Sequence, residues 1–309
     1  MKKILLFTLS LLLSTAAFAQ QSPKEIVIGS NSIRLKQDLT RGGAICYISQ
    51  SNEDRNLVNI CDEGRYIQQS YYAGRSVNRQ NEGQCATWSP WAWNPIQVGD
   101  YARNRAEILD FSNKGRKSYV KCIPMQWDMN NKPAEATMEQ WTSIKGNVVH
   151  VRNRLVCNRT DDLYGEGVVC SQEIPAVYVI SALKNLYSYF GDKPFSHQPI
   201  KSTEVKQLIM NDPEHFWGLY RDASEQWMAF VNDSGWGIAV YSPSAEAFLA
   251  GRFDSFLEGD EHHVACSYIA PIKQEALKKD SVMEYEYYLI IGTLDEMRKN
   301  IYKFNRKQR

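Results

Sequence analysis

Apolar and polar side chains alternate along much of the chain, as they do in strands that bury one face. In residues 147–158, Val149 and Val151 point to one side, while His150 and Arg152 point to the other. The pattern predicts a mostly β, antiparallel protein. Similar runs predict further strands at residues 25–28, 33–36, 43–49, 117–127, 168–180, 226–231, 236–241, 263–269 and 283–291.

Helical signals occur in two places. Thr293 and Glu296 form a capping box, in which each side chain satisfies a free backbone N–H group near the other, and apolar residues follow at helical spacing. This predicts a short C-terminal helix against the edge of a sheet. Residues 181–190 are a second candidate for a turn of helix. We predict one domain over residues 20–309, built from two packed antiparallel sheets.

The first residues have the three parts of a cleavable secretory signal. Two lysines follow Met1, residues 4–13 are almost all apolar, and residues 17–19 match the small-x-small pattern of a signal peptidase site. The apolar run is too short for a membrane anchor, and no later segment is apolar enough to span a membrane. We expect residues 1–19 to be removed near Ala19, leaving the protein in the periplasm, at the cell surface or secreted.

Charge and motifs exclude several classes of function. Loss of Lys2 and Lys3 with the signal peptide changes the formal charge from +1 to −1, which argues against a nucleic-acid partner. The chain has no G-x-S-x-G elbow, no phosphate-binding glycine loop and no dinucleotide fingerprint. None of the seven cysteines forms a C-x-x-C pair, so we expect buried free thiols, with one or two disulfides as the alternative.

Polar and aromatic residues cluster in residues 56–74. If this segment is extended, Tyr66, Gln68, Ser70 and Tyr72 share one face. Rings and planar amides together suit a sugar, because they match its C–H faces and its paired hydroxyl groups. The alternative is a polar network that satisfies a buried strand. The candidate residues of this segment are Asp62, Arg65, Gln68, Gln69 and Tyr72.

A tryptophan-rich loop follows at residues 87–100. Trp91 and Trp93 share a face if the loop is extended, and Gln97 lies close after them. Prolines stiffen the loop, and tryptophans exposed on a stiff loop favour a ligand or a partner. The alternative is an aromatic plug beneath a long loop.

Two later positions are candidates for acid/base chemistry. Glu173 lies in an otherwise apolar strand that also carries Tyr178, and burial there would raise the pKa of a carboxyl group towards that of a working acid or base. The alternative is an ion pair of Glu173 with Arg152 or Arg154. His263 opens the strand that carries Tyr268 and is the second candidate.

We expect no cofactor. The H-E-x-x-H zinc pattern is missing, and the adjacent His262 and His263 would face opposite ways in a strand. The alternative is a calcium ion held by the acidic residues Glu258, Asp260 and Glu261.

Several short motifs resemble the galactose-mutarotase-like β-sandwich family, especially its secreted members from Bacteroidetes. The matching runs are GGAI at 42–45, NLVN at 56–59, D-x-GR-x-x-Q at 62–68, WGIAVYSP at 236–243 and YIAP at 268–271. The resemblance implies an antiparallel β-supersandwich whose concave sheet face receives a sugar. Its relatives include epimerases, glycoside hydrolases, polysaccharide lyase domains and non-catalytic sugar-binding modules, and fold alone does not choose among them.

The mutarotases of this family use two histidines and a glutamate, and the motif of the first histidine has no counterpart in this chain. The leading hypothesis is therefore an exported enzyme that cleaves an oligosaccharide or polysaccharide. Hydrolysis would use Asp62 and Glu173, with His263 as a substitute. Elimination would use Arg65 or Arg252 to neutralise a uronic acid, with Tyr72, Tyr268 or His263 moving the proton. The alternatives are a non-catalytic sugar-binding protein and an envelope structural or assembly protein.

Overall fold

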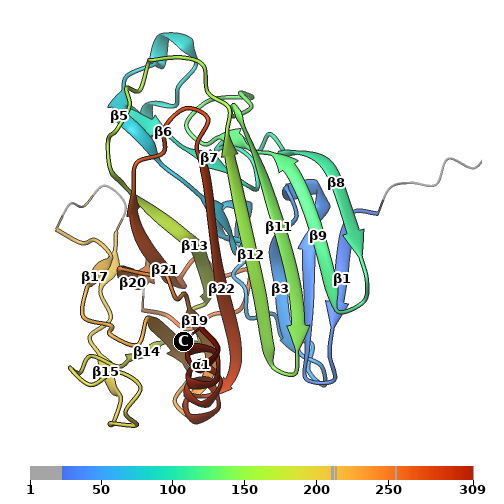
Figure 1. Cartoon of the computed structure of the whole chain (residues 1–309), viewed down its shortest axis with the longest axis vertical. Helices are drawn as coiled ribbons and strands as arrows, with labels where there is room; N and C mark the ends of the chain where they lie inside the picture. The colour runs from blue at the N-terminus through green and yellow to red at the C-terminus, as the bar shows by residue number, and fades with distance from the viewer. Residues whose placement is uncertain (1–22, 210–211, 213, 255, 309) are drawn as a thin grey trace, which may run out of the picture.

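The chain folds as a β-sandwich followed by one α-helix. The structure is a computed structural model that describes residues 23–209, 212, 214–254 and 256–308. Its strands form a nine-stranded and an eight-stranded sheet, with smaller sheets of three and two strands (Figure 1). The predicted all-β fold is confirmed. The predicted signal peptide lies outside the described residues, so its removal stays a prediction.

The larger sheet runs through nine neighbouring strands, all antiparallel. In spatial order these are β15 (Lys201–Thr203), β14 (Asn185–Ser188), β18 (Trp227–Val231), β19 (Trp236–Tyr241), β22 (Val282–Thr293), β12 (Val148–Cys157), β11 (Ala136–Lys145), β9 (Lys117–Ile123) and β8 (Glu107–Asn113).

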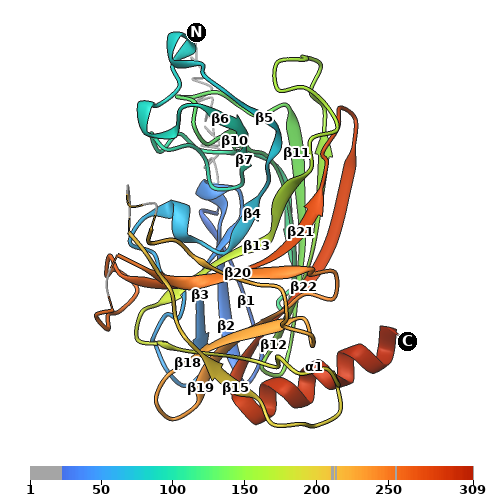
Figure 2. The ribbon, with the colours of Figure 1, turned by 90° about the vertical axis from the view of Figure 1, so that its left-hand side faces the viewer.

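The second sheet crosses the first and carries the site described below (Figure 2). Its spatial order is β10 (Met125–Gln126), β7 (Pro95–Ile96), β4 (Gln68–Ser70), β13 (Cys170–Ile180), β21 (Cys266–Glu275), β20 (Ala247–Phe253) and β16 (Gln207–Leu208), with β17 (Gly218–Tyr220) also paired to β20. The small sheets are β1 (Glu25–Gly29), β2 (Ile33–Asp38) and β3 (Ala44–Gln50), and β5 (Ala73–Val77) with β6 (Trp91–Trp93). Short 3-10 helices span Leu39–Arg41, Glu63–Arg65, Gln80–Glu82 and Ala86–Trp88.

The main core fills the space between the two large sheets. Val151 on β12 and Tyr287 on β22 belong to the same buried cluster as Ile174 on β13 and Ile269 on β21. The alternation predicted for residues 147–158 is confirmed, because β12 buries Val149, Val151 and Leu155 completely. Burial of apolar surface between two sheets is the main force that holds a sandwich together.

The C-terminal helix α1 (Leu294–Gln308) begins with the predicted capping box. The backbone N–H of Thr293 donates to the carboxylate of Glu296 at 2.9 Å. Met297 and Ile301 then pack against Trp227 in a cluster on the outer face of the nine-stranded sheet. The helix therefore covers a sheet face, and the predicted position against a sheet edge is wrong. Among the described residues, no helix is long and apolar enough to cross a membrane.

Residues 181–190 do not form the predicted turn of helix. They contain strand β14, because Leu186 pairs with Phe230 on β18 and lies fully buried. All seven cysteines are free thiols, of which Cys122, Cys157 and Cys266 are buried and the other four partly exposed. The default expectation of free thiols is confirmed, although Cys46 is less buried than predicted.

Candidate functional site

A large cavity opens on the outer face of the eight-stranded sheet. Its volume is about 1040 Å³, and a smaller cavity of about 140 Å³ adjoins it, because seven residues line both. Strand β13 supplies the floor, with Glu173 and Tyr178 in both linings. The remaining walls come from segments on either side of β13.

A β-bulge decides that Glu173 faces this cavity. Successive residues of a strand point to opposite faces, so Glu173 and Tyr178 would face opposite ways in a regular strand. The pairing of β13 with β21 shifts register between Glu173 and Val177, and this shift brings Glu173 and Tyr178 to the same face. Pro175 lies inside the bulge, where the missing N–H group removes no ladder hydrogen bond.

Neutral hydroxyl groups surround the carboxyl group of Glu173. The phenol of Tyr268 on β21 donates a hydrogen bond to Oε1 of Glu173, and Ser70 on the neighbouring strand β4 also hydrogen-bonds to the carboxylate. Burial raises the pKa of Glu173 above its ordinary value, and these two hydrogen bonds offset only part of the rise. A carboxyl group in this state can hold a proton closer to neutral pH than an exposed one does.

One aromatic cluster stands on the β4 side of Glu173. We call it the first aromatic cluster, and it consists of Tyr72, Trp88, Trp91 and Trp127. The rings meet edge to face, with centroid distances of 6.3 Å for Tyr72–Trp91, 5.2 Å for Trp88–Trp91 and 6.0 Å for Trp88–Trp127. All four rings are partly exposed and line both cavities.

The second aromatic cluster lies on the β20 side and consists of Tyr178, Trp217, Phe253 and Tyr268. The ring of Tyr268 lies 4.5 Å from that of Tyr178 and 4.6 Å from that of Trp217, centroid to centroid. Trp217 in turn lies 6.5 Å from Phe253. Tyr268 is fully buried, whereas the other three rings line the large cavity.

An ion pair lies at the rim of the cavity. Nε of Arg65 is 2.9 Å from Oδ2 of Asp62, and both residues line the cavity. The same guanidinium group donates to the backbone carbonyl of Val264 and lies 4.6 Å from the ring centroid of Phe253. The position of Arg65 is thus fixed by three neighbours, while the Asp62 side chain stays 42% exposed.

The tyrosines of the site are neutral phenols. Burial, followed by the charge of Glu173, raises the pKa of Tyr72 and of Tyr178 far above its ordinary value. The same two causes act on Tyr268. At neutral pH these groups can donate hydrogen bonds, but they do not act as bases.

The structure brings most of the predicted site residues together. Gln68 lines the smaller cavity beside Ser70 and Tyr72, as predicted for one face of an extended segment. The fourth predicted member of that face, Tyr66, packs against the buried cluster of Ala44, Ile96 and Val98 instead. The large cavity is lined by the predicted residues Asp62, Arg65, Tyr72, Trp91, Glu173 and Tyr178.

Four predicted substrate-binding residues are buried away from the cavity. Gln69 and Gln97 face the sandwich interior, where the backbone N–H of Gln69 donates to Oε1 of Gln97 at 3.0 Å. Trp93 is fully buried and donates to Glu135 at 3.3 Å, so it does not share a face with Trp91. Arg252 donates to backbone carbonyl groups of the protein and lines neither cavity. The polar groups of these four side chains are engaged with partners inside the protein, so they are not available to a ligand in the cavity.

His263 and Tyr268, two further predicted site residues, also lie outside the lining of both cavities. Nδ1 of His263 accepts a hydrogen bond from the backbone N–H of Ala265 at 3.0 Å, and the residue lies outside both cavity linings. Tyr268 lies beneath Glu173 and outside both linings. It can orient the carboxyl group, but it does not face a ligand in the cavity.

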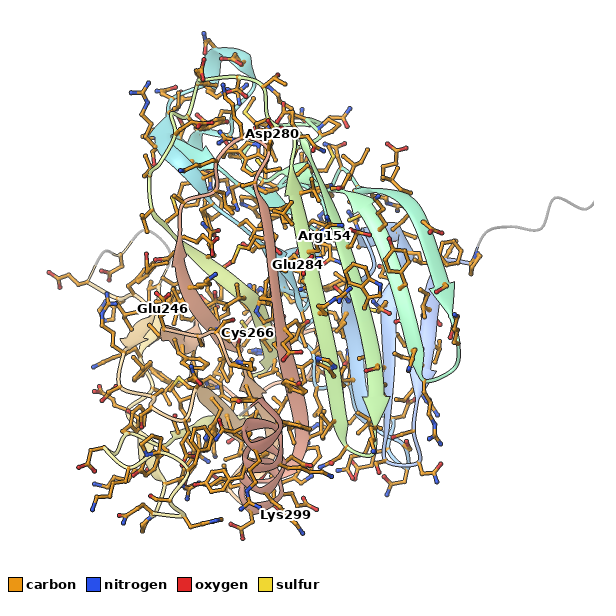
Figure 3. The ribbon with its side chains drawn as sticks, in the orientation of Figure 1. Arg154, Glu246, Cys266, Asp280, Glu284 and Lys299 are labelled. Atoms are coloured by element: carbon orange, nitrogen blue, oxygen red, sulfur yellow. The ribbon has the colours of Figure 1, made fainter. Side chains whose placement is uncertain are left out.

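The structure supports neither the alternative ion pair of Glu173 with Arg152 or Arg154 nor the alternative calcium site at Glu258, Asp260 and Glu261. Arg154 pairs with Glu139 at 3.1 Å and with Glu284 at 3.2 Å on the outer face of the other sheet, where Figure 3 shows Arg154 and Glu284 together. Arg152 stacks over Trp141 on the same sheet. In the described part of the chain, no three His, Cys, Asp or Glu side chains are placed to hold a metal, and Glu258 pairs with Lys184.

Sequence reasoning missed several residues of the site. Trp88 was part of the tryptophan-rich loop, but its spacing set it apart from Trp91 and Trp93. Trp127 ends a predicted strand, and Trp217 lies in a segment without a clear pattern. Their convergence depends on strand order, which local periodicity does not encode.

Comparison with known proteins places the fold. No protein-family model matches the chain, and no curated protein sequence matches it. A candidate aldose 1-epimerase from Escherichia coli K12 superposes with a TM-score of 0.51 at 11% identity, over 87% of this chain and 99% of that one. A galactose mutarotase related enzyme from Lactobacillus acidophilus gives 0.51 at 11% identity, over 88% and 99%. A galactose mutarotase-like protein from Lactobacillus casei ATCC 334 gives 0.51 at 10% identity, over 86% and 99%. The chain therefore has the galactose-mutarotase-like β-sandwich fold.

Proposed function

We propose that this protein is a carbohydrate-active enzyme that cleaves a glycan by hydrolysis. The observation that carries the proposal is that two carboxyl groups, Glu173 and Asp62, open onto one cavity lined by aromatic rings. Sugar sites combine apolar surface with a few convergent polar groups, and glycoside hydrolysis needs a pair of carboxyl groups. The fold supports a sugar ligand, since a structural neighbour is described as a galactose mutarotase related enzyme.

Glu173 is the general acid of this proposal. Its raised pKa keeps a proton available, and that proton passes to the glycosidic oxygen as the bond to the anomeric carbon breaks. Asp62 is the second carboxylate, and it removes a proton from the attacking water or forms the glycosyl intermediate. Arg65 holds Asp62 in place through their 2.9 Å contact.

The competing choices of acid/base group are less well supported. The tyrosines around Glu173 stay protonated at neutral pH, which disfavours an elimination that uses a phenolate base. His263 lies outside the lining of the cavity. Hydrolysis through Glu173 therefore fits the geometry better than elimination.

We also propose that the enzyme is exported. Residues 1–19 have the pattern of a cleavable signal, so a mature domain of residues 20–309 would work in the periplasm, at the cell surface or outside the cell. N-terminal sequencing of the protein from its native envelope fraction tests this, with Gln20 as the expected first residue. A chain that keeps Met1 and stays in the cytoplasm would contradict it.

The test of function is a panel of oligosaccharides and polysaccharides incubated with the wild type, E173Q, D62N and E107Q. Products are separated and reducing ends are counted. A positioned acid or base contributes about 10²–10⁴-fold to a rate, so E173Q and D62N should each lose about that much of kcat. Glu107 is exposed on the edge strand β8, and its variant should keep wild-type activity.

Three other outcomes would each contradict the proposal. Full activity in E173Q would show that Glu173 is not the acid. A glycan that binds to the wild type but stays intact would indicate a non-catalytic sugar-binding protein. A co-purifying protein partner, with no glycan bound or cleaved, would indicate an envelope assembly role.

A further inference from the structure

We infer that the ligand of this site is an uncharged oligosaccharide that crosses Glu173, with sugar rings on both aromatic clusters. The inference rests on the proposed function and specifies its substrate class. Three observations support it: the order of the strands beneath the cavity, the size of the cavity, and the state of its charged groups.

Strand order places Glu173 between the two aromatic clusters. The strands run β4, β13, β21, β20, and Figure 2 shows them crossing the molecule in succession. Tyr72 and Trp91 lie at the β4 side, while Phe253 lies on β20 and Trp217 next to it. A sugar bond held at Glu173 therefore has a stacking surface for the ring on each side of it.

The cavity is too large for a single sugar ring. Its volume of about 1040 Å³ reaches the upper end of the range of about 300–1,000 Å³ for sites that bury a drug-sized ligand. The smaller cavity of about 140 Å³ extends it under the first aromatic cluster. A chain of several rings would bury its apolar C–H faces along both clusters, and burial of apolar surface favours binding.

The charges of the lining disfavour an acidic sugar. Among the described lining residues, Arg65 is the only cation, and Asp62, Val264 and Phe253 already surround it. The carboxylate of Asp212 adds a second negative charge to that of Asp62, with His215 at 2.8 Å as the partner of Asp212. A uronic acid would meet like charges and would lose hydration without gaining a free cation.

The experiment compares matched hexamers that differ only at C6. Titration calorimetry measures cellohexaose against its uronate counterpart, mannohexaose against mannuronate hexamer, and α-1,4-linked galactohexaose against galacturonate hexamer. In every pair that binds, the neutral member should bind at least about tenfold more tightly, a difference that one well-formed polar contact can supply. D62N should reduce this difference in affinity between the neutral and the uronate hexamers, because it removes a negative charge and the ion-pair partner of Arg65.

Tryptophan variants test whether the chain crosses Glu173. W91A and W217A should each lower the affinity for the neutral hexamer by about tenfold, because each removes a ring on which a sugar would stack. The matched control is W141A, since Trp141 is half-buried on the other sheet and stacks with Arg152. W141A should bind like the wild type. The single sugar should bind more weakly than the hexamer and respond to only one of the two cavity variants.

The outcomes separate this inference from the proposed function. Tighter binding of a uronate hexamer would overturn the charge selection and leave glycan cleavage standing. A hexamer that responds to only one of W91A and W217A would overturn the crossing geometry. No binding to any hexamer would overturn both the inference and the proposed function.

Discussion

Tyr268 supports Glu173 from beneath the cavity floor through a hydrogen bond from its phenol to Oε1 of the carboxyl group. The ring of Tyr268 is itself packed between Tyr178 and Trp217 at centroid distances of 4.5 Å and 4.6 Å. The orientation of the carboxyl group and the wall of the cavity therefore depend on the same buried side chain. A change at Tyr268 should alter the acid/base group without removing a ligand contact.

The first prediction concerns Y268F. The hydrogen bond from Tyr268 lowers the pKa of Glu173 against the effect of burial, so its loss should raise that pKa further. If Glu173 acts as the acid, the alkaline limb of the kcat/KM profile should move to higher pH, and kcat should fall roughly tenfold. An unchanged profile with only a change in KM would show that Tyr268 merely shapes the cavity.

The second prediction concerns the stability of E173Q. The folded-state pKa of Glu173 lies above its ordinary value of 4.5, so protonation favours the folded state. Below pH 4.5 the wild type should be about as stable as E173Q, and it should become less stable than E173Q as pH rises through the raised pKa. Thermal unfolding of both proteins between pH 4 and pH 8 measures this. Glu107 is exposed, so the stability of E107Q relative to the wild type should not change with pH. If E107Q gained stability over the wild type as strongly as E173Q does, burial of Glu173 would not be the cause.

The third prediction concerns the anchor of helix α1. Arg298 contacts the fully buried carboxylate of Glu225 at 2.8 Å, and Tyr302 donates to the same group at 2.6 Å. Breaking a buried ion pair typically costs about 3–5 kcal/mol, so E225Q should lower the free energy of unfolding by about 3 kcal/mol.

Denaturant titration compares E225Q with E284Q. Glu284 pairs with Arg154 on the sheet surface, where an ion pair is worth about 0–1 kcal/mol. Burial raises the pKa of Glu225, but its hydrogen bonds outweigh this and lower the pKa overall. The deficit of E225Q should therefore be full at neutral pH and shrink as the pH falls through the lowered pKa. If E225Q and E284Q lost the same free energy of unfolding, Glu225 would not be a buried anchor of helix α1.

The fourth prediction concerns Gly74, which lines the cavity. Its φ is +73°, and an added Cβ would lie 2.3 Å from the carbonyl oxygen of Tyr164. Gly165 has nearly the same φ, +71°, with nothing within 4 Å of an added Cβ. The left-handed conformation costs a non-glycine residue about 1–2 kcal/mol, so G165A should lose about that much and G74A clearly more. Equal loss of unfolding free energy in the two variants would show that the close approach to Tyr164 is relieved cheaply.

The chain's alternation predicted the sandwich because period-two burial is a local property. Strand β12 and the capping box at Thr293 and Glu296 were found where the sequence placed them. The turn of helix predicted at residues 181–190 was wrong, because strand β14 forms there through pairing with β18. Helix α1 was predicted, but the face that it covers depends on the register of distant strands.

The candidate site was predicted in part for the same reason. Glu173 and Tyr178 were identified from composition, but their common face depends on a register shift that alternation alone does not show. Trp93 and Gln97 had the right chemistry, yet both side chains are buried and donate to other residues of the protein, Glu135 and Gly42. Trp217 carried no local signal, because only the pairing of β17 with β20 brings it to the cavity.

The bulge in β13 changes how this strand must be aligned with other sequences. The four steps from Glu173 to Val177 on β13 lie opposite only three steps, from Ile272 to Ile269, on β21. In a relative without the extra residue the two strands would match, and a glutamate four positions before the tyrosine would share its face, as Glu173 shares a face with Tyr178 here across five positions. An alignment that opens no gap in this stretch would therefore pair the acid of one protein with an inward-facing residue of the other.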